Sequence, residues 1–138
     1  MTSFYLRVKP EHEKAVGETY AAAWMDPHFP MLQYQTCVKQ ELEEFRSGKP
    51  NGTYECFLNL LKFIPADRMT LLDVGASSGY YSEVLKIRGF QNEIDYTACD
   101  YSTHYKDLAG KLFPEIKFKV GSAMELPFES NSYDIVLH

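Results

Sequence analysis

The segment that most constrains the fold of this chain is residues 71–80, which read LLDVGASSGY. A compact apolar run passes into a loop with two glycines and then into a helical pattern. Gly75 lets the backbone turn sharply off the end of the run, and Gly79 lets a ligand or a neighbouring backbone come close because it has no Cβ atom. The free N–H groups that open the next helix can receive acceptor atoms of a ligand. A strand, a glycine loop and a helix in this order are typical of nucleotide-binding sheets.

Short apolar runs alternate with helical patterns from this segment onwards. The pattern predicts strands over residues 70–74, 95–99, 116–120 and 133–137, and helices over residues 80–88 and 103–113. Such alternation predicts a parallel α/β sheet with right-handed crossovers and with helices on both faces.

The first half of the chain has helical periodicity instead. The spacing predicts helices over residues 11–24, 30–46 and 52–63, separated by breaks at Asp26-Pro27 and at residues 47–50. We therefore divide the chain into an N-terminal helical cap region, residues 1–66, and an α/β region, residues 67–138.

Composition and charge argue against several classes of protein. The net charge is −5 and no cluster of Lys and Arg stands out, so nothing favours nucleic-acid binding. Cys37, Cys56 and Cys99 are far apart and odd in number, which argues against a disulfide framework or a metal site. No stretch resembles a signal peptide or reaches membrane-spanning length, so we expect a cytoplasmic protein without a membrane partner.

Two acidic residues at predicted strand ends are candidate ligand-binding groups. Asp73 lies in an apolar strand, where a carboxylate is costly unless an incoming ammonium group or the loop amides pair with it. Asp100 follows the second strand, 21 residues after Gly79, where an acidic side chain accepts the ribose hydroxyls in sheets of this type. Asp100 could instead cap the next helix, but Ser102 is an equally good cap and would leave Asp100 to a ligand.

Further candidates follow the second and third strands at the same predicted edge. Tyr101 could stack on an adenine ring, and Met124 could lie on that ring. Ser122 and Ala123 could read the adenine edge with backbone and hydroxyl groups. Three successive strand ends, each with a group that a nucleoside needs, predict a nucleoside-binding site.

Over residues 69–138, roughly half of its length, the chain resembles the class I S-adenosylmethionine (SAM)-dependent methyltransferases. It is most similar to the small-molecule group that includes ubiquinone- and menaquinone-biosynthesis enzymes. The first loop of that family usually reads acidic-x-Gly-x-Gly-x-Gly, and here Ser77 stands where the middle glycine is expected. Ser122 stands where the family often has an aspartate. The strings LPF at residues 126–128 and SYDIV at residues 132–136 are close to the family pattern.

The resemblance implies SAM as the cofactor and a small molecule as the methyl acceptor. The implied cofactor-binding residues are Asp73, Gly75, Ala76, Ser77, Gly79, Asp100, Tyr101, Ser122, Ala123, Met124 and His138. Asp73 and Gly75 would lie near the methionine moiety, and Asp100 would hold the ribose. Tyr101 and residues 122–124 would bound the adenine. His138 would open the loop after the fourth strand, beside the sulfonium and the acceptor, and is the candidate catalytic general base.

The implied fold is a Rossmann-like doubly wound parallel sheet with strands 1 to 4 in the order 3-2-1-4, under an N-terminal helical cap. Family members continue with strands 5 to 7, which are absent here, so we expect a truncated chain. One edge of the fourth strand, residues 135–137, would then be apolar and unpaired, and would favour a homo-oligomer.

Two other functions compete with this interpretation. A nicotinamide-dependent oxidoreductase would also use Asp100, but Gly75 and Gly79 do not fit its G-x-G-x-x-G fingerprint, and the Gly-Lys-Ser/Thr of a P-loop is absent. From another class, the alternative is a non-catalytic SAM-binding module, or a partner subunit completed by another chain.

Overall fold

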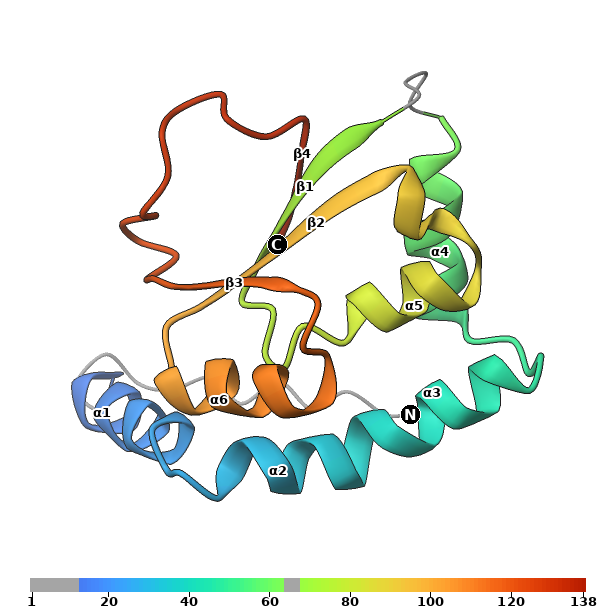
Figure 1. Cartoon of the computed structure of the whole chain (residues 1–138). Helices are drawn as coiled ribbons and strands as arrows, with labels where there is room; N and C mark the ends of the chain where they lie inside the picture. Colours follow the sequence, from blue (N-terminus) through green and yellow to red (C-terminus); the bar gives the residue numbers. More distant parts are fainter. Residues whose placement is uncertain (1–12, 64–67) are drawn as a thin grey trace.

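The sheet at the centre of the molecule has four parallel strands in the order β3-β2-β1-β4 (Figure 1). The computed structural model describes residues 13–63 and 68–138. The strands are β1 (Met69–Val74), β2 (Ile94–Asp100), β3 (Lys117–Val120) and β4 (Ile135–Leu137). The predicted Rossmann-like parallel sheet with strand order 3-2-1-4 is confirmed.

The flanking helices begin and end close to the predicted positions. They are α1 (Glu13–Trp24), α2 (Phe29–Gln33), α3 (Lys39–Arg46), α4 (Gly52–Leu61), α5 (Tyr81–Ile87) and α6 (Thr103–Leu112), with a π-helical turn η2 (Tyr34–Val38) and a 3-10 turn η3 (Phe90–Asn92). The side chain of Asn51 caps α4, because its oxygen accepts the N–H groups of Thr53 and Tyr54 at 3.1 and 3.2 Å. The predicted boundary between the two regions, at residues 66 and 67, lies outside the described residues.

One face of the sheet carries the main hydrophobic core. Buried side chains of α3, α4 and α5 pack there against alternate residues of β1 and β2, as the period of two along a strand requires. Phe45 of α3, Leu71 of β1 and Ala98 of β2 are fully buried in this core. Helices α3 and α4 of the N-terminal helical region are therefore held in place by packing against the strands of the α/β region.

The opposite face is covered by a loop and not by a helix, within the residues that the structure describes. Leu72, Val74 and Cys99 pack there against Phe128 and Tyr133, whose rings meet edge to face at 5.3 Å. The expectation of helices on both faces is not met in this part of the sheet. β1, β2 and β3 succeed one another in one direction, so right-handed crossovers place the helices between them on a single face.

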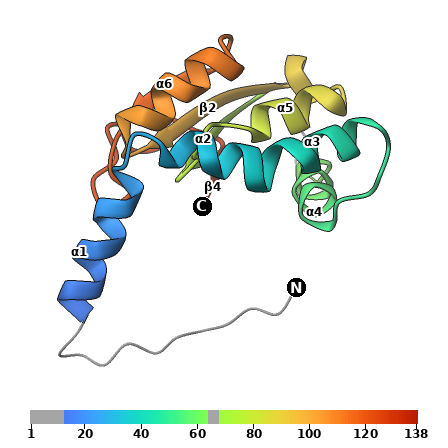
Figure 2. The same cartoon turned by 90° about the horizontal axis from the view of Figure 1, so that it is seen from below.

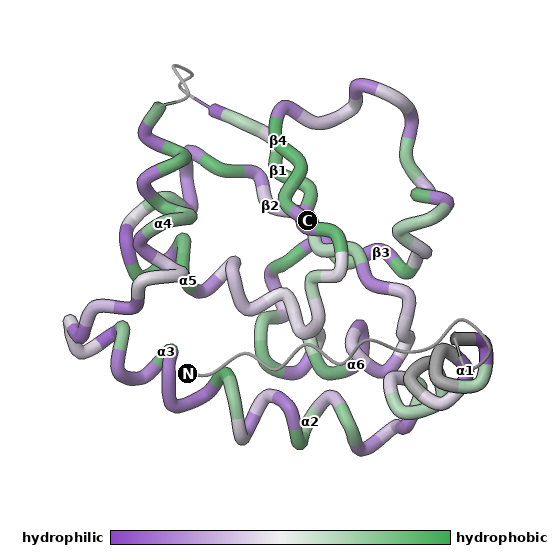
Figure 3. Tube along the Cα trace, turned by 180° about the vertical axis from the view of Figure 1, so that it is seen from behind, coloured by the Kyte–Doolittle hydropathy of each residue, from purple (hydrophilic) through white to green (hydrophobic). Residues whose placement is uncertain are grey.

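The segments α2, η2 and α3 form one long helix that runs past the carboxyl ends of the strands and beside α6 (Figure 1). Polar and apolar residues alternate along it (Figure 3). In η2 the N–H of Lys39 bonds to the carbonyl of Tyr34, five residues back, which is a π-helical turn of the kind often found at functional sites.

Helix α1 extends away from the rest of the chain (Figure 2). At its end, the ring of Trp24 lies 4.9 Å from the ring of Phe29 and 6.1 Å from that of Tyr105 in α6. Across residues 13–63 and 68–138, no helix combines the length and the apolar character needed to span a membrane.

Gly79→Ala should lower the free energy of unfolding by about 2–4 kcal/mol, because the backbone has a positive φ and the new Cβ would clash with Ile116. Gly79 has a φ of +73°, and a Cβ there would lie 2.5 Å from Cδ1 of Ile116. Urea unfolding monitored by circular dichroism measures the change.

Two matched alanine variants separate the two causes. Gly89 has a φ of +83° but nothing within 4 Å of a Cβ, so Gly89→Ala should cost only about 1–2 kcal/mol. Gly110 lies in the last turn of α6 with open space beside it, and Gly110→Ala should raise the free energy of unfolding by about 0.5–1 kcal/mol. Equal losses for Gly79→Ala and Gly89→Ala would contradict the tight contact with Ile116.

Candidate functional site

The loops that follow β1, β2 and β3 leave the sheet at the same edge. The N–H groups of Gly75 and Ala76, directly after β1, both donate to the carbonyl of Cys99 in β2, at 2.9 and 3.1 Å. The N–H group of Gly121, directly after β3, donates to the carbonyl of Asp100 at 2.9 Å. The three strand ends singled out in the sequence are therefore neighbours in space.

A cavity of about 280 Å³ lies between this edge and the long helix formed by α2, η2 and α3. The residues that line it are Trp24, Gln33, Cys37, Val38, Glu41, Asp73, Gly75, Ala76, Ser77, Tyr80, Tyr81 and Asp100. Five of these residues were candidates from the sequence alone: Asp73, Gly75, Ala76, Ser77 and Asp100. Among the described residues, three that line the cavity are carboxylic acids and none is Lys, Arg or His, so these residues favour a cation over an anion.

Asp73 is the most deeply buried acid of this cavity, with 4% of its surface exposed. The hydroxyl of Tyr96 in β2 donates to its Oδ2 at 2.5 Å, so over residues 13–63 and 68–138 the partner of this carboxylate is a tyrosine and not the loop amides. Burial raises the pKa of Asp73 to about 6; the bond from Tyr96 lowers it, and the nearby charge of Asp100 raises it further. A positive group on a ligand would compensate this buried charge.

Asp100 is held in place by the loops on both sides of it. Its Oδ2 accepts the N–H of Ser77 at 2.9 Å, and its Oδ1 accepts the N–H of Ser102 at 3.2 Å. Burial raises the pKa of Asp100, and bonds from the backbone N–H groups of Ser102, Ser77 and Tyr101 lower it. The carboxylate thus joins the loop after β1 to the start of α6.

The prediction that the side chain of Ser102 caps α6 is wrong. Ser102 occupies the N-cap position, but its side chain makes no capping bond, and its buried hydroxyl has no partner among the described residues. Asp100 accepts the backbone N–H of Ser102 itself, in a local turn of the kind that aspartate forms.

The loop after β1 contains three residues with positive φ: Gly75 at +75°, Ser77 at +54° and Gly79 at +73°. The space beside Gly75 is open, since a Cβ there would meet nothing within 4 Å, and this suits a ligand. Gly79 is outside the cavity lining, and its missing Cβ makes room for Ile116. Ser77 adopts a conformation that costs an L-residue about 1–2 kcal/mol.

The remaining candidate residues lie at the same edge but do not line the cavity. They are Tyr101, Ser122, Ala123, Met124 and His138. Tyr101 is 41% exposed and Met124 is 94% exposed, and the Oγ of Ser122 accepts the N–H of Met124 at 3.1 Å. His138 is exposed directly after β4. Their roles in ligand binding stay predictions.

Gln33, Cys37 and Glu41 are cavity residues that sequence reasoning missed. They are spaced four residues apart along the long helix, so they form one stripe of it. The stripe runs beside the buried apolar residues Val38 and Leu42. A polar stripe next to an apolar one was the feature of the sequence that could have identified these three residues. Glu41 also accepts the hydroxyl of Tyr54 at 3.3 Å.

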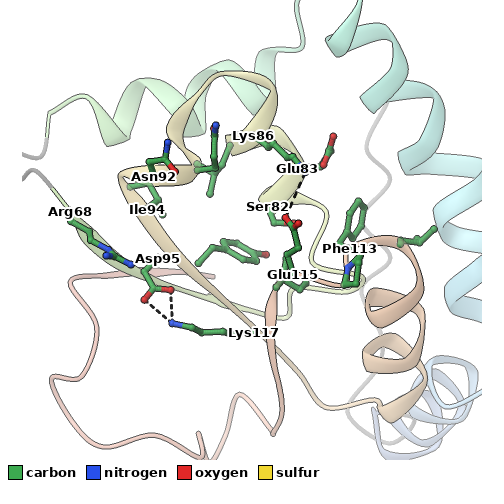
Figure 4. A pocket seen from close by; sticks show the side chains of 16 residues that line it. Arg68, Ser82, Glu83, Lys86, Asn92, Ile94, Asp95, Phe113, Glu115 and Lys117 are labelled. Carbon is green, nitrogen blue, oxygen red and sulfur yellow. Dashed lines mark hydrogen bonds and ion pairs between the residues drawn. The ribbon is translucent and has the colours of Figure 1, made fainter.

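A second cavity, of about 380 Å³, lies at the opposite, amino ends of the strands (Figure 4). Opposite charges pair in its wall: Lys117 with Asp95 at 2.6 Å and Lys86 with Glu115 at 3.8 Å. None of the candidate residues lines it. Ligands of open α/β sheets bind at the carboxyl ends of the strands, which favours the smaller cavity.

Comparison with known proteins gave one family and several similar chains. Residues 72–138 match the family model described as methyltransferase domain. The biotin biosynthesis bifunctional protein BioHC of Cellvibrio japonicus (strain Ueda107) is 28% identical, over 87% of this chain and 27% of that protein. The chain therefore spans about a quarter of the length of this curated relative.

Two solved structures are among the similar chains. The YcgJ protein of Bacillus subtilis is 20% identical over 61% of this chain and 36% of its own, with a TM-score of 0.48. A putative S-adenosyl-L-methionine-dependent methyltransferase of Methanococcus maripaludis is 17% identical over 99% of this chain and 52% of its own, with a TM-score of 0.45.

Asp73→Asn should stabilise the chain by about 2–3 kcal/mol at pH 8 and change its stability little at pH 4. The folded state keeps the proton of Asp73 up to a pKa of about 6, whereas the unfolded chain releases it near 3.8. The folded state binds more protons between these values, so the free energy of unfolding of the wild type falls as the pH rises from about 4 to about 6.

Asparagine carries no charge and can still accept the hydroxyl of Tyr96. Urea unfolding of both proteins at pH 4 and pH 8 gives the comparison. The same stability difference at the two pH values would show that the carboxyl of Asp73 titrates normally.

Proposed function

We propose, from the premise that residues 72–138 belong to the methyltransferase-domain family, that this chain binds SAM at the carboxyl edge of its sheet and transfers the methyl group to a small molecule. SAM is the cofactor of the class I methyltransferases that the sequence resembles. The observation that carries the proposal is the acidic cavity between the Gly75 loop and the long helix.

The charge of the cavity fits this cofactor. SAM carries a sulfonium and an ammonium group against a single carboxylate, so its net charge is positive. Glu41, Asp73 and Asp100 line the cavity, and no basic residue of the part of the chain that the structure describes joins them. Pairing of the ammonium group with Asp73 would offset the cost of burying that carboxylate, whose hydrogen-bond partner among the described residues is the hydroxyl of Tyr96.

Asp100 is suited to hold the ribose. A carboxylate has about four acceptor sites, and the loop amides that bind Asp100 leave room for hydroxyl donors. In the proposal Gly75, Ala76 and Ser77 approach the cofactor through the backbone, and Gly79 supports this loop from behind. In the proposal Tyr101 and residues 122–124 bound the adenine.

When bound, SAM supplies a methyl group that the lone pair of an acceptor takes while the carbon–sulfur bond breaks and its electron pair stays on sulfur. The chain contributes alignment and the exclusion of water. Leu137 pairs with Asp73 across the sheet, so His138 follows β4 at the cofactor edge. In the proposal His138 accepts the proton of acceptors that must lose one.

The surroundings of the site support a small organic acceptor in the cytoplasm. Trp24, Tyr80 and Tyr81 give the cavity aromatic walls, which suit such ligands.

Cys37 and Cys56 are exposed free thiols, as expected in a reducing compartment. Val136 of β4 is 59% exposed, and pairing of β4 with another strand, from a second copy or a partner, is part of the proposal.

Asp100→Ala should weaken SAM binding by about 1.5–3 kcal/mol, the cost of losing hydrogen bonds to a charged group. Asp95→Ala is the matched control, because Asp95 lies at the amino end of the same strand and pairs with Lys117. Its dissociation constant should equal that of the wild type. Isothermal titration calorimetry measures both.

An unchanged dissociation constant in Asp100→Ala would remove Asp100 from the site. A methyl-transfer assay over a panel of small acceptors then separates the two functional classes. Turnover supports the enzyme, whereas SAM binding without turnover would favour the non-catalytic module.

A further inference from the structure

The side-chain amide of Gln33 is fixed by two hydroxyl groups from distant parts of the chain. Its Oε1 accepts the Oγ hydroxyl of Ser77 at 2.7 Å and the phenol hydroxyl of Tyr105 at 2.7 Å. Ser77 belongs to the loop after β1, Tyr105 to α6, and Gln33 ends α2. These bonds determine which end of the amide faces the loop, and they leave its nitrogen directed away from both hydroxyls.

The amide nitrogen is therefore available to a ligand. Gln33 lines the acidic cavity, and within residues 13–63 and 68–138 its Nε2 has no hydrogen-bond acceptor. An amide nitrogen carries two N–H donors. Among residues 13–63 and 68–138 no Lys, Arg or His lines the cavity, so these residues meet an anionic group of a ligand with neutral donors such as this amide and the loop N–H groups.

Gln33 is also connected to the loop after β1 that would bind the cofactor. Ser77, which binds Gln33 through its hydroxyl, donates its backbone N–H to Asp100. The amide is thus attached to the same loop that would follow the cofactor from its ribose to its amino-acid end. The hydroxyl of Ser77, at a position where glycine would fit the φ of +54° more easily, has a role that glycine could not perform.

We propose that Gln33 donates from Nε2 to the amino-acid carboxylate of SAM, a role that rests on the proposed function of the chain. The hydroxyl groups of Ser77 and Tyr105 have a positioning role, because they orient the amide of Gln33. The N-terminal helical region then supplies a specific binding group for the amino-acid half of the cofactor, while the α/β region binds the nucleoside half.

Two substitutions of Gln33 and two ligands test this assignment. Gln33→Leu removes both ends of the amide, and Gln33→Glu keeps an oxygen for the hydroxyls of Ser77 and Tyr105 but replaces the donor nitrogen by a second carboxylate oxygen. SAM and 5′-methylthioadenosine share the nucleoside and the sulfur, but only SAM has the amino-acid carboxylate. Calorimetry on the whole chain gives each dissociation constant.

The affinity for SAM should fall about tenfold in Gln33→Leu and further in Gln33→Glu, where two carboxylates repel one another. The affinity of both variants for 5′-methylthioadenosine should stay within about twofold of the wild type. Tyr105→Phe, which loses one orienting hydroxyl, should show a smaller loss that is again confined to SAM. Gln35→Glu places the same charge on an exposed position of the helix and should bind both ligands normally.

Equal losses for SAM and 5′-methylthioadenosine would overturn the proposal, because they would mean that Gln33 only holds the loop. Unchanged SAM binding in Gln33→Glu would overturn it as well. Circular dichroism of each variant identifies loss of folding. If Gln33→Leu does not fold, the affinities of Tyr105→Phe and Gln33→Glu for the two ligands test the proposal. A wild-type chain that binds neither ligand would instead overturn the proposed function, and this proposal with it.

Discussion

Parallel pairing of β1 with β2 is the constraint on which the rest of the site depends. The pairing joins Asp73 to Ala98 and Val74 to Cys99, so both strands end at the same edge of the sheet. Asp100 and the Gly75 loop are then close enough for the backbone of Ser77 to bind the Asp100 carboxylate. An antiparallel pair would separate these groups by the full length of a strand.

That convergence collects negative charge in a place that solvent reaches poorly. Asp73 and Asp100 are both buried, and burial raises the pKa of each. The free chain therefore holds part of its site in an unfavourable electrostatic state, which a cationic ligand would relieve. The same field would repel the carboxylate of SAM, and this is why a neutral donor such as the amide of Gln33 matters in the proposed site.

The strands, the glycine loop and Asp100 could be predicted because local pattern determines them. The apolar runs and glycines specify strand ends, and parallel strands must share an edge. The contribution of Gln33 could not be predicted in this way, since the helix face that meets the sheet is chosen by tertiary packing. The capping role of the Ser102 hydroxyl failed for a related reason: local sequence identifies the residue at the N-cap position but does not determine the orientation of its side chain.

The central claim, that successive strand ends meet on one nucleoside, is tested most directly by following backbone amide resonances while SAM is added. The amides of residues 75–77, 100–102 and 121–123 should shift together along one saturating curve. The amides of Arg68, Asp95 and Lys117, around the cavity at the amino ends of the strands, should stay unperturbed. Saturable shifts confined to those last three residues, with the loop amides unchanged, would contradict it.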